Sequence, residues 1–537
     1  MEGPTKQIPS EEPGDEAAEM IDRLKNLKEA KQEVLFGGGK DKIEKHHKAG
    51  KLTARERIAL LVDPGSFLEW NPLLGRTRSL PAEGVITGVG MIHGRPVCVF
   101  SQDATVAGGS MSHWHGFKVH RTIERAIEMR VPVIGLWDSP GARIEKPDDG
   151  GNAGVVPNTD KHEASVFYPN TEASGLIPQI SVILGSCAGT AVYSPALTDF
   201  IFMVDGISHM FITGPRIVES VLREMISKED LGGAKVHTKI TGVADLRFKS
   251  EKDCFDELRR FMSYLPQNNQ EKAPIVQTGD DRDRVDGDIA TLIPDSPNKA
   301  YDMRKVISRI VDNGEFFEIK PEFAEEIVVG FSRLGGEAVG IIANQPMVRA
   351  GSLTVDSADK EARFIRFCDS FNIPLVMLID TPAYMPGSAQ EHKGIIRHGA
   401  KVLYALCEST VPRVAVVLRK CYGGGNLGMG ITPGMKVDFT FYWPFAEAGV
   451  VGAEQAVELF YADELAKAGD MKALRAEMIC QYRERYADPM INASQNLYAD
   501  DVIDPAETRK ILIRTLAFLR TKSRDTRISK RHGNIPL

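Results

Sequence analysis

Short apolar runs separated by glycine turns form the main pattern along most of this chain. From Gly84 two such runs flank His93-Gly94, which is predicted to be a hairpin turn between two strands. Residues 117–129 place apolar side chains at helical spacing, and the next run, Val131 to Trp137, is typical of a buried strand. Val414 to Leu418 predicts another buried strand. This alternation of strand, helix and strand predicts an α/β fold with right-handed crossovers.

Charged segments come before the first strands. Residues 1–20 are polar and are expected to be flexible. Residues 21–50 predict a charged helix, a glycine break and a second, basic helix. Such an arm lies across a partner or its own domain, and the alternative is a pair of solvated helices. Thr53 is predicted to cap a further helix that ends near Asp63.

The pattern occurs twice. Gly94-Arg95-Pro96-Val97 matches Gly336-Glu337-Ala338-Val339, 242 positions later, and the segments at 109–110, 131–133 and 138–140 repeat at the same offset. The offset then becomes 234, where Ile177-Pro178 matches Val411-Pro412 and Cys187 matches Cys421. The chain therefore contains two copies of one fold, joined near a polar linker at 265–286.

Composition removes several classes of function. The 537 residues are 42% hydrophobic and 26% charged, with a formal net charge of −7, which describes a globular protein without the basic face that nucleic-acid binding needs. The sequence contains no apolar run of membrane-spanning length, and its acidic N-terminus resembles neither a secretory signal nor a transit peptide. Seven scattered cysteines predict reduced thiols rather than a zinc site, and a cytoplasmic location is expected.

One glycine-rich stretch, Arg419 to Met429, follows the predicted strand at 414–418. Consecutive glycines let the backbone approach a ligand closely with its N–H groups free, although a flexible surface loop is the alternative. The second copy favours the ligand-binding interpretation, because Gly185 to Thr190 occupies the matching place in the first half. N–H groups aimed at a developing negative charge form an oxyanion hole, in which one donor contributes ~3 kcal/mol in other enzymes. Two half-sites indicate one substrate oxygen for each copy.

Neighbouring residues suggest further chemistry. The corners at 138–141 and 380–383 follow the adjacent strands and offer additional N–H groups. His113, His115 and His120 lack a convincing fourth metal ligand, so surface or interface positions are favoured over a metal site. Cys187 and Cys421 lie beside the two loops, where a small buried residue is favoured over a nucleophile.

Several longer motifs make the chain similar to a known family. They include DSPGARI (138–144), GSCAGTAVYSPALTDF (185–200), LGGAKVHTKITGVA (231–244), QEHKGIIRHGAK (390–401) and the terminal HGNIPL (532–537). With the duplication, they resemble the carboxyltransferase (β) subunit of biotin-dependent acyl-CoA carboxylases, the group that includes propionyl-CoA and methylcrotonyl-CoA carboxylases. The resemblance implies an α/β fold built as a duplicated crotonase-like β-β-α superhelix with two homologous domains. The expected organisation is a flexible N-terminus at 1–20, an acyl-CoA-side domain at 21–272, a biotin-side domain at 276–520 and a C-terminal tail at 521–537.

The resemblance also implies ligands and a mechanism. Carboxybiotin, carried on a biotin carboxylase and biotin carrier (α) subunit, releases CO2, and biotin then takes the proton next to the thioester of a CoA substrate. The resulting carbanion attacks the CO2, so neither a side-chain base nor a metal is needed. The family also implies a homo-hexamer, with active sites between domains of different subunits. By similarity Gly189 and Thr190 serve the thioester, and Gly424 and Gly425 serve biotin.

Substrate contacts are expected from Gly141, Ala142, Arg143, Asn426 and Leu427. Arg143 either binds CoA phosphates or forms a structural ion pair. The internal repeat places the biotin-side pair one residue earlier, at Gly423 and Gly424, so its register is open. Pro140 has no N–H, which leaves Gly141 or Ala142 as the donor at that corner.

Departures from the family pattern bear on the substrate. Asn426-Leu427 replaces the Tyr-Asp that is typical of the propionyl branch, so a different or branched acyl group is expected. Two alternatives to carboxylation are kept. One is the carboxyltransferase of a decarboxylase acting on a malonyl-type CoA, and the other is a non-catalytic assembly partner that retains the fold.

Overall fold

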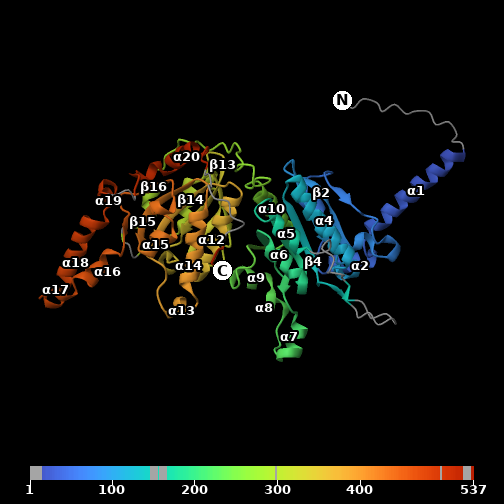
Figure 1. Ribbon diagram of the computed structural model, residues 1–537, viewed down its shortest axis with the longest axis horizontal. Coiled ribbons are helices and arrows are strands. Elements are labelled where there is room, and N and C mark those ends of the chain that lie inside the picture. Colours follow the sequence, from blue (N-terminus) through green and yellow to red (C-terminus); the bar gives the residue numbers. More distant parts are fainter. Residues whose placement is uncertain are drawn as a thin grey trace.

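The computed structural model describes residues 15–144, 155–156, 166–294, 296, 299–495, 499–523 and 534–536. Two eight-stranded sheets dominate it, one in each half of the chain (Figure 1). In both sheets antiparallel strands at one edge lead into parallel strands that continue to the other edge. The duplicated α/β architecture predicted from the sequence is therefore present.

The first sheet has the order β1-β2-β3-β4-β7-β8-β10, with β9 paired to β7. Its strands are β1 (Leu68–Trp70), β2 (Val85–Ile92), β3 (Arg95–Gln102), β4 (Val133–Ser139), β7 (Gln179–Ala188), β8 (Phe200–Val204), β9 (His209–Phe211) and β10 (Leu246–Phe248). The second has the order β11-β12-β13-β14-β15-β16-β18, with β17 paired to β15. Its strands are β11 (Phe317–Ile319), β12 (Ile327–Leu334), β13 (Glu337–Asn344), β14 (Leu375–Thr381), β15 (Arg413–Tyr422), β16 (Phe439–Tyr442), β17 (Glu447–Gly449) and β18 (Asp501–Val502). A separate pair joins β5 (Arg143–Ile144) to β6 (Val155–Val156).

Helices connect and cover these strands. In the first half they are α1 (Asp15–Leu35), α2 (Lys40–Lys48), α3 (Ala54–Leu61), α4 (His113–Met129), α5 (Phe167–Ala173), α6 (Tyr193–Leu197), α7 (Pro215–Leu222), α8 (Lys228–Gly232), α9 (Ala234–Lys239) and α10 (Glu251–Met262). In the second half they are α11 (Met303–Ile310), α12 (Val355–Ser370), α13 (Ser388–Glu391), α14 (Ile395–Glu408), α15 (Gly424–Gly428), α16 (Ala453–Phe460), α17 (Ala462–Lys467), α18 (Met471–Tyr482), α19 (Pro489–Gln495) and α20 (Thr508–Leu519).

The internal repeat extends to single hydrogen-bonded positions. Strands β2, β3 and β4 recur as β12, β13 and β14 at the 242-residue offset, and β7 recurs as β15 at 234. The parallel ladder is irregular at the same place in both copies, just before Ser139 pairs with Cys187 and Thr381 pairs with Cys421. Each half therefore presents the same strand ends to its candidate site.

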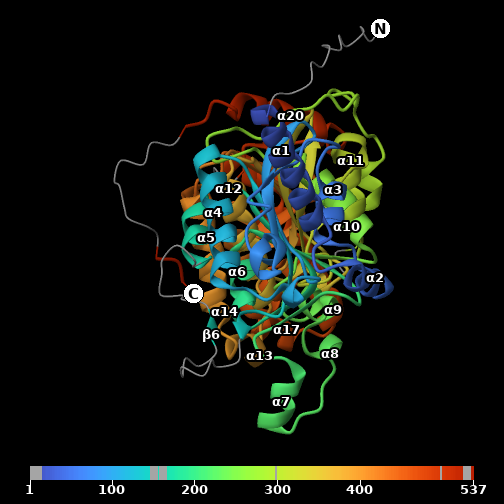
Figure 2. The same cartoon turned by 90° about the vertical axis from the view of Figure 1, so that its right-hand side faces the viewer.

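One apolar core joins the two halves. Phe200 and Phe261 of the first half pack among Phe317, Phe331 and Phe367 of the second. The ring centroids of Phe200 and Phe367 are 4.6 Å apart, and those of Phe261 and Phe317 are 5.2 Å apart. The two sheets accordingly lie next to each other and are not separate domains joined only by a linker (Figures 1 and 2).

The N-terminal arm follows the predicted pattern. Helices α1 and α2 are separated by Gly37 to Gly39, and residues 15–20, predicted to be flexible, form the first part of α1. Thr53 caps α3 as predicted: its Oγ1 accepts from the Glu56 N–H at 3.4 Å, and the Glu56 carboxylate accepts from the Thr53 N–H at 2.7 Å. The rest of the predicted flexible segment and residues 524–533 of the predicted tail lie outside the described residues.

Peripheral helices extend away from both sheets. Helix α7 projects from the first half, and α16 to α19 project from the second (Figure 1). Across the described ranges, none of the helices combines the length and apolar character needed to cross a bilayer.

Candidate active site with two matched backbone loops

The first loop lies at the end of β7. Gly189 adopts a left-handed conformation with φ of 61°, and its N–H donates to the carbonyl of Ile212 at 3.1 Å. Thr190 comes next, as the second residue of a short 3-10 turn, Gly189–Val192, where a backbone N–H has no acceptor within the turn. A Cβ added to Gly189 would meet no atom within 4 Å, so its Cα faces open space. A ligand can therefore approach the backbone closely here.

The corner after β4 reaches this loop. A Cβ added to Gly141 would lie 2.6 Å from the carbonyl oxygen of Ala188, so the two segments are in contact. The Gly141 N–H donates to Ser139 Oγ at 3.1 Å. Met111 donates to the Gly141 carbonyl and accepts from the Arg143 N–H, both at 2.9 Å, so the N–H of Ala142 between them faces away from Met111. Of the two donors left open by Pro140, Ala142 is therefore the available one.

The second loop repeats this geometry at the end of β15. Gly423 has φ of 50°, and its N–H donates to the carbonyl of Gly449 at 2.9 Å. Gly424 and Gly425 open helix α15, in the first turn where N–H groups lack intrahelical acceptors. Most of the glycine-rich stretch is thus the end of a strand and a short helix rather than a loop.

The corner after β14 lies against these glycines. A Cβ added to Gly424 would be 3.0 Å from Tyr384 Cδ2, and one added to Gly425 would be 3.7 Å from the backbone of Ala383. Leu353 donates its N–H to the Ala383 carbonyl and accepts from the Met385 N–H. It therefore pairs with Tyr384 in the same way that Met111 pairs with Ala142. The Tyr384 N–H is therefore the counterpart of the Ala142 N–H. The 242-residue offset relates these two positions, which is the signal that would have found Tyr384 from the sequence.

A cavity of about 590 Å³ adjoins the second loop. Its walls include Pro382, Ala383, Tyr422, Gly423 and Gln455. Asn426 Nδ2 donates to the Gly449 carbonyl at 3.1 Å, and Leu427 is 43% exposed. A second cavity, of about 470 Å³ between the two halves, is lined by Asp199, Lys360 and Arg363 among others and by none of the predicted site residues.

Comparison with known proteins identifies the family. The family model for the carboxyl transferase domain matches residues 45–535. The chain is 47% identical over 526 residues to the propionyl-CoA carboxylase carboxyltransferase subunit of Haloferax mediterranei, covering 96% of this chain and 100% of that protein. It is 45% identical over 528 residues to the methylmalonyl-CoA decarboxylase subunit alpha of Veillonella parvula, covering 97% and 100%.

A solved structure of transcarboxylase 12S, described as a hexamer and with methylmalonyl-coenzyme A and methylmalonic acid bound, superposes with a TM-score of 0.89 at 40% identity, covering 99% of this chain and 100% of that one. The chain belongs to the carboxyl transferase family. As a carboxyltransferase it is an enzyme, and its two sheets form the duplicated crotonase-like fold implied by the sequence resemblance.

In this carboxyltransferase the two thiols that lie beside the loops are buried and are not exposed nucleophiles. Cys187 and Cys421 are fully buried, and burial raises the pKa of both thiols far above the ordinary value. A thiolate is the reactive form of cysteine, so these residues pack the strand ends, as the sequence interpretation favoured.

Arg143 and His115 have internal partners. The Arg143 guanidinium donates to the Ser110 carbonyl at 3.0 Å and lies 3.5 Å from Glu83 Oε2. These contacts correspond to the ion-pair alternative, and a CoA contact by Arg143 stays a prediction. His115 is buried between the Glu83 carbonyl and Gln102, and burial lowers its pKa to about 3.

Proposed function

We propose that this carboxyltransferase transfers a carboxyl group from biotin, carried on a partner chain, to the α-carbon or vinylogous γ-carbon of a short or branched acyl-CoA. The observation that carries the proposal is the matched pair of loops. In each half a left-handed glycine donates its N–H to the carbonyl at the end of a short neighbouring strand, β9 or β17, and the following N–H groups lie beside the N–H of a neighbouring corner.

The acyl-CoA thioester binds in the first half under this proposal. The N–H groups of Thr190 and Ala142 hold the thioester oxygen and stabilise the negative charge that develops as the α-proton leaves. Each donor contributes ~3 kcal/mol of transition-state stabilisation where water is excluded. Gly189 contributes its left-handed turn, because its own N–H is engaged by Ile212.

Biotin binds in the second half. The cavity beside Gly423 has room for its bicyclic ring, and the free N–H groups of Gly424, Gly425 and Tyr384 suit its ureido oxygen. When bound, biotin supplies the transferable carboxyl group and a ring nitrogen that can take a proton. The biotin-side pair is thus assigned to Gly424 and Gly425, since the Gly423 N–H is already donated to Gly449.

Partners complete the enzyme. We infer a biotin carboxylase and biotin carrier (α) subunit, and a homo-hexamer like the transcarboxylase 12S core in which halves of different subunits face each other. Leu427, where an acid is typical of the propionyl branch, favours a larger or branched acyl group over propionyl-CoA. A cytoplasmic location stays a prediction.

The test is reconstitution with a panel of acyl-CoA substrates. The purified chain is combined with its biotin-carrying partner, ATP and bicarbonate, and carboxylation of each thioester is measured. Absence of thioester-dependent carboxylation across the panel contradicts the proposal.

A second candidate has support from relatives named methylmalonyl-CoA decarboxylase, one of which is 45% identical to this chain. In that case the same site removes a carboxyl group from a malonyl-type CoA, and the net direction of flux distinguishes the two. A non-catalytic assembly role is disfavoured by the intact geometry of both loops. Calorimetry that detects no CoA binding would favour it.

A further inference from the structure

A buried aspartate lies beneath each candidate oxyanion hole. Asp138 and Asp380 are the second-last residues of β4 and β14, 242 positions apart, and each lies four positions before Ala142 or Tyr384. Their backbone N–H groups are held alike, by the side-chain oxygens of Gln102 and Asn344 at 2.9 and 3.1 Å. A buried carboxylate requires a positive partner, and the two halves obtain that partner differently.

In the second half the neighbouring strand supplies it. Arg419 Nε lies 2.9 Å from Asp380 Oδ2, and Lys420 Nζ lies 3.8 Å from Oδ1. Both residues belong to β15, two and one positions before the Cys421 that pairs with Thr381.

In the first half the same two positions hold no cation. The residues two and one positions before Cys187 are Gly185 and Ser186. A Cβ added to Gly185 would lie 1.8 Å from Asp138 Oδ1 and 2.6 Å from Lys51 Nζ. The space that a side chain at 185 would need is thus filled by Asp138 and by a lysine from outside the sheet.

The end of the N-terminal arm and the segment that follows it, up to α3, bring the charges instead. Lys51 Nζ lies 2.5 Å, Arg57 Nη1 3.1 Å and His46 Nε2 3.8 Å from the same atom, Asp138 Oδ2. Lys51 and Arg57 flank the capping box that starts α3, which fixes their spacing.

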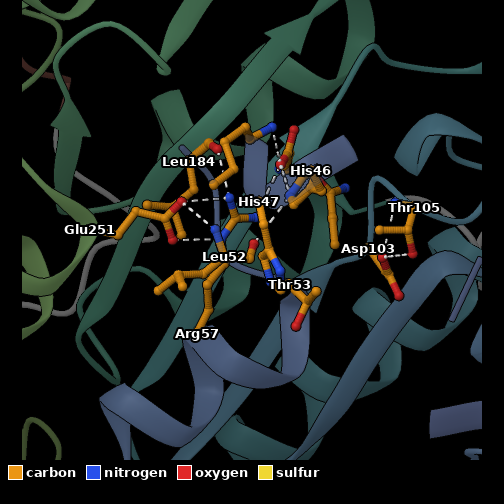
Figure 3. A network of polar contacts seen from close by, with 12 residues as sticks. His46, His47, Leu52, Thr53, Arg57, Asp103, Thr105, Leu184 and Glu251 are labelled. Atoms are coloured by element: carbon orange, nitrogen blue, oxygen red, sulfur yellow. Dashed lines mark hydrogen bonds and ion pairs between the residues drawn. The ribbon is translucent and has the colours of Figure 1, made fainter. Parts of the chain in front are cut away.

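Arg57 is held by several buried polar contacts. It is fully buried, with Nε and Nη2 each 2.9 Å from the carboxylate of Glu251 and Nη2 2.8 Å from the carbonyl of Leu184 (Figure 3). Glu251 opens α10, and Leu184 belongs to β7, so Arg57 ties α3 to both of these elements.

We infer that Lys51 and Arg57, which directly follow the N-terminal arm, are positioning residues for the acyl-side oxyanion hole, replacing the strand-borne pair Arg419 and Lys420 of the other half. The inference rests on the proposed function of that hole. Without these cations the Asp138 carboxylate gains by turning toward water. Because Ala142 follows only four residues later, such a movement displaces the N–H aimed at the thioester oxygen.

Lys51 is the better residue to change, because Arg57 also neutralises Glu251. The experiment compares two ligands by calorimetry: the acyl-CoA itself, and a CoA nitronate whose anionic oxygen takes the place of the enolate oxygen. Lys51→Met should weaken nitronate binding on the order of tenfold, because the displaced N–H donors no longer contact the anionic oxygen. Binding of the acyl-CoA should change little, because the contacts to its CoA moiety are kept. Lys51→Arg should restore the preference, and Lys48→Met, an exposed lysine of the N-terminal arm, should leave it intact.

Asp138→Asn offers a second route that keeps the shape of the side chain. It should lose the nitronate preference as well, and adding Lys51→Met to it should cause little further loss. If the wild type prefers the nitronate and both Lys51→Met and Asp138→Asn keep the same preference as the wild type, the positioning role alone is overturned. Wild-type protein that binds neither CoA ligand contradicts the proposed function, and the positioning role with it.

Discussion

Gly189 and Gly423 occupy the same position in the two halves, with φ of 61° and 50°. Gly189 donates its N–H to the carbonyl of Ile212, just after β9, and Gly423 donates its N–H to the carbonyl of Gly449, at the end of β17. This shared turn consumes the first N–H of each loop and orients the ones that follow. The two glycines therefore contribute their backbone conformation, and under the proposed function the donors are Thr190 in one half and Gly424 and Gly425 in the other.

Replacing Gly189 by alanine tests that distinction. An added Cβ meets no atom within 4 Å, so steric overlap is absent and the left-handed backbone costs about 1 kcal/mol. Gly94→Ala is the matched control, because Gly94 has φ of 72° and equally open space in a hairpin turn. Both variants should lower the urea midpoint similarly, but only Gly189→Ala should lower kcat, by about tenfold or more. Equal kcat values would contradict the assignment.

The buried thiols should be dispensable. Burial raises the pKa of Cys187 and Cys421, so neither supplies a thiolate near neutral pH. We expect Cys187→Ala and Cys421→Ala to retain kcat within about threefold, with some loss of stability from the small cavity. In the wild type, iodoacetamide should label the exposed Cys407 and Cys480 first, by peptide mass spectrometry. Loss of activity in step with labelling of Cys421 would point to a nucleophile.

Leu427 should influence the choice of acyl group. Its side chain is 43% exposed beside the biotin-side loop, at the place where the propionyl branch typically carries an acid. A carboxylate there disfavours a larger apolar group, so Leu427→Asp should shift the ratio of kcat/KM values toward the shorter acyl-CoA by about tenfold. Leu427→Met serves as the control. An unchanged ratio across the panel would exclude a role in specificity.

Glu361 on α12 makes stability depend on pH. Both carboxyl oxygens are buried without a hydrogen-bond partner among the described residues, and burial raises the pKa of Glu361 well above its ordinary value. Unfolded chains release this proton from about pH 4.5 upward while the folded chain retains it, so its contribution to stability is lost as pH rises toward the folded pKa. Glu361→Gln does not titrate. Its urea midpoint relative to wild type should therefore be higher at about pH 8 than at about pH 5.

The control for that comparison is Glu464→Gln, at an exposed position of α17. Its midpoint relative to wild type should be the same at both pH values. A Glu361→Gln difference that is likewise independent of pH would mean that the carboxyl group is ionised in the folded chain.

Much of the fold could be predicted because the signals are local and repeated. The Thr53 capping box, the His93-Gly94 turn and the buried strand at Val133–Ser139 each follow from short-range chemistry. The repeat then supported the strands at its matched segments with a second copy of each. The predicted domain boundaries at 272 and 276 remain predictions, because the apolar core runs through both halves.

The site was predictable only in part, for a physical reason. Glycine composition marks where backbone N–H groups are exposed. The carbonyls that accept from particular N–H groups belong to Ile212, just after β9, and to Gly449 in β17, both more than 20 residues away. The partners of Asp138 lie still farther along the chain, at Lys51 and Arg57. Such contacts depend on how elements pack rather than on spacing in the sequence.

The central claim, carboxyl transfer between biotin and a CoA thioester in the paired loops, is tested most directly in the reverse direction. The purified chain is incubated with free biotin and a malonyl-type CoA radiolabelled in its free carboxyl group, and acid-labile label on biotin is measured. We predict transfer by the wild type and its loss in Gly424→Val, whose side chain would press on Tyr384. Absence of label on biotin with the wild type across the carboxylated CoA panel, or equal transfer by Gly424→Val, would contradict the account.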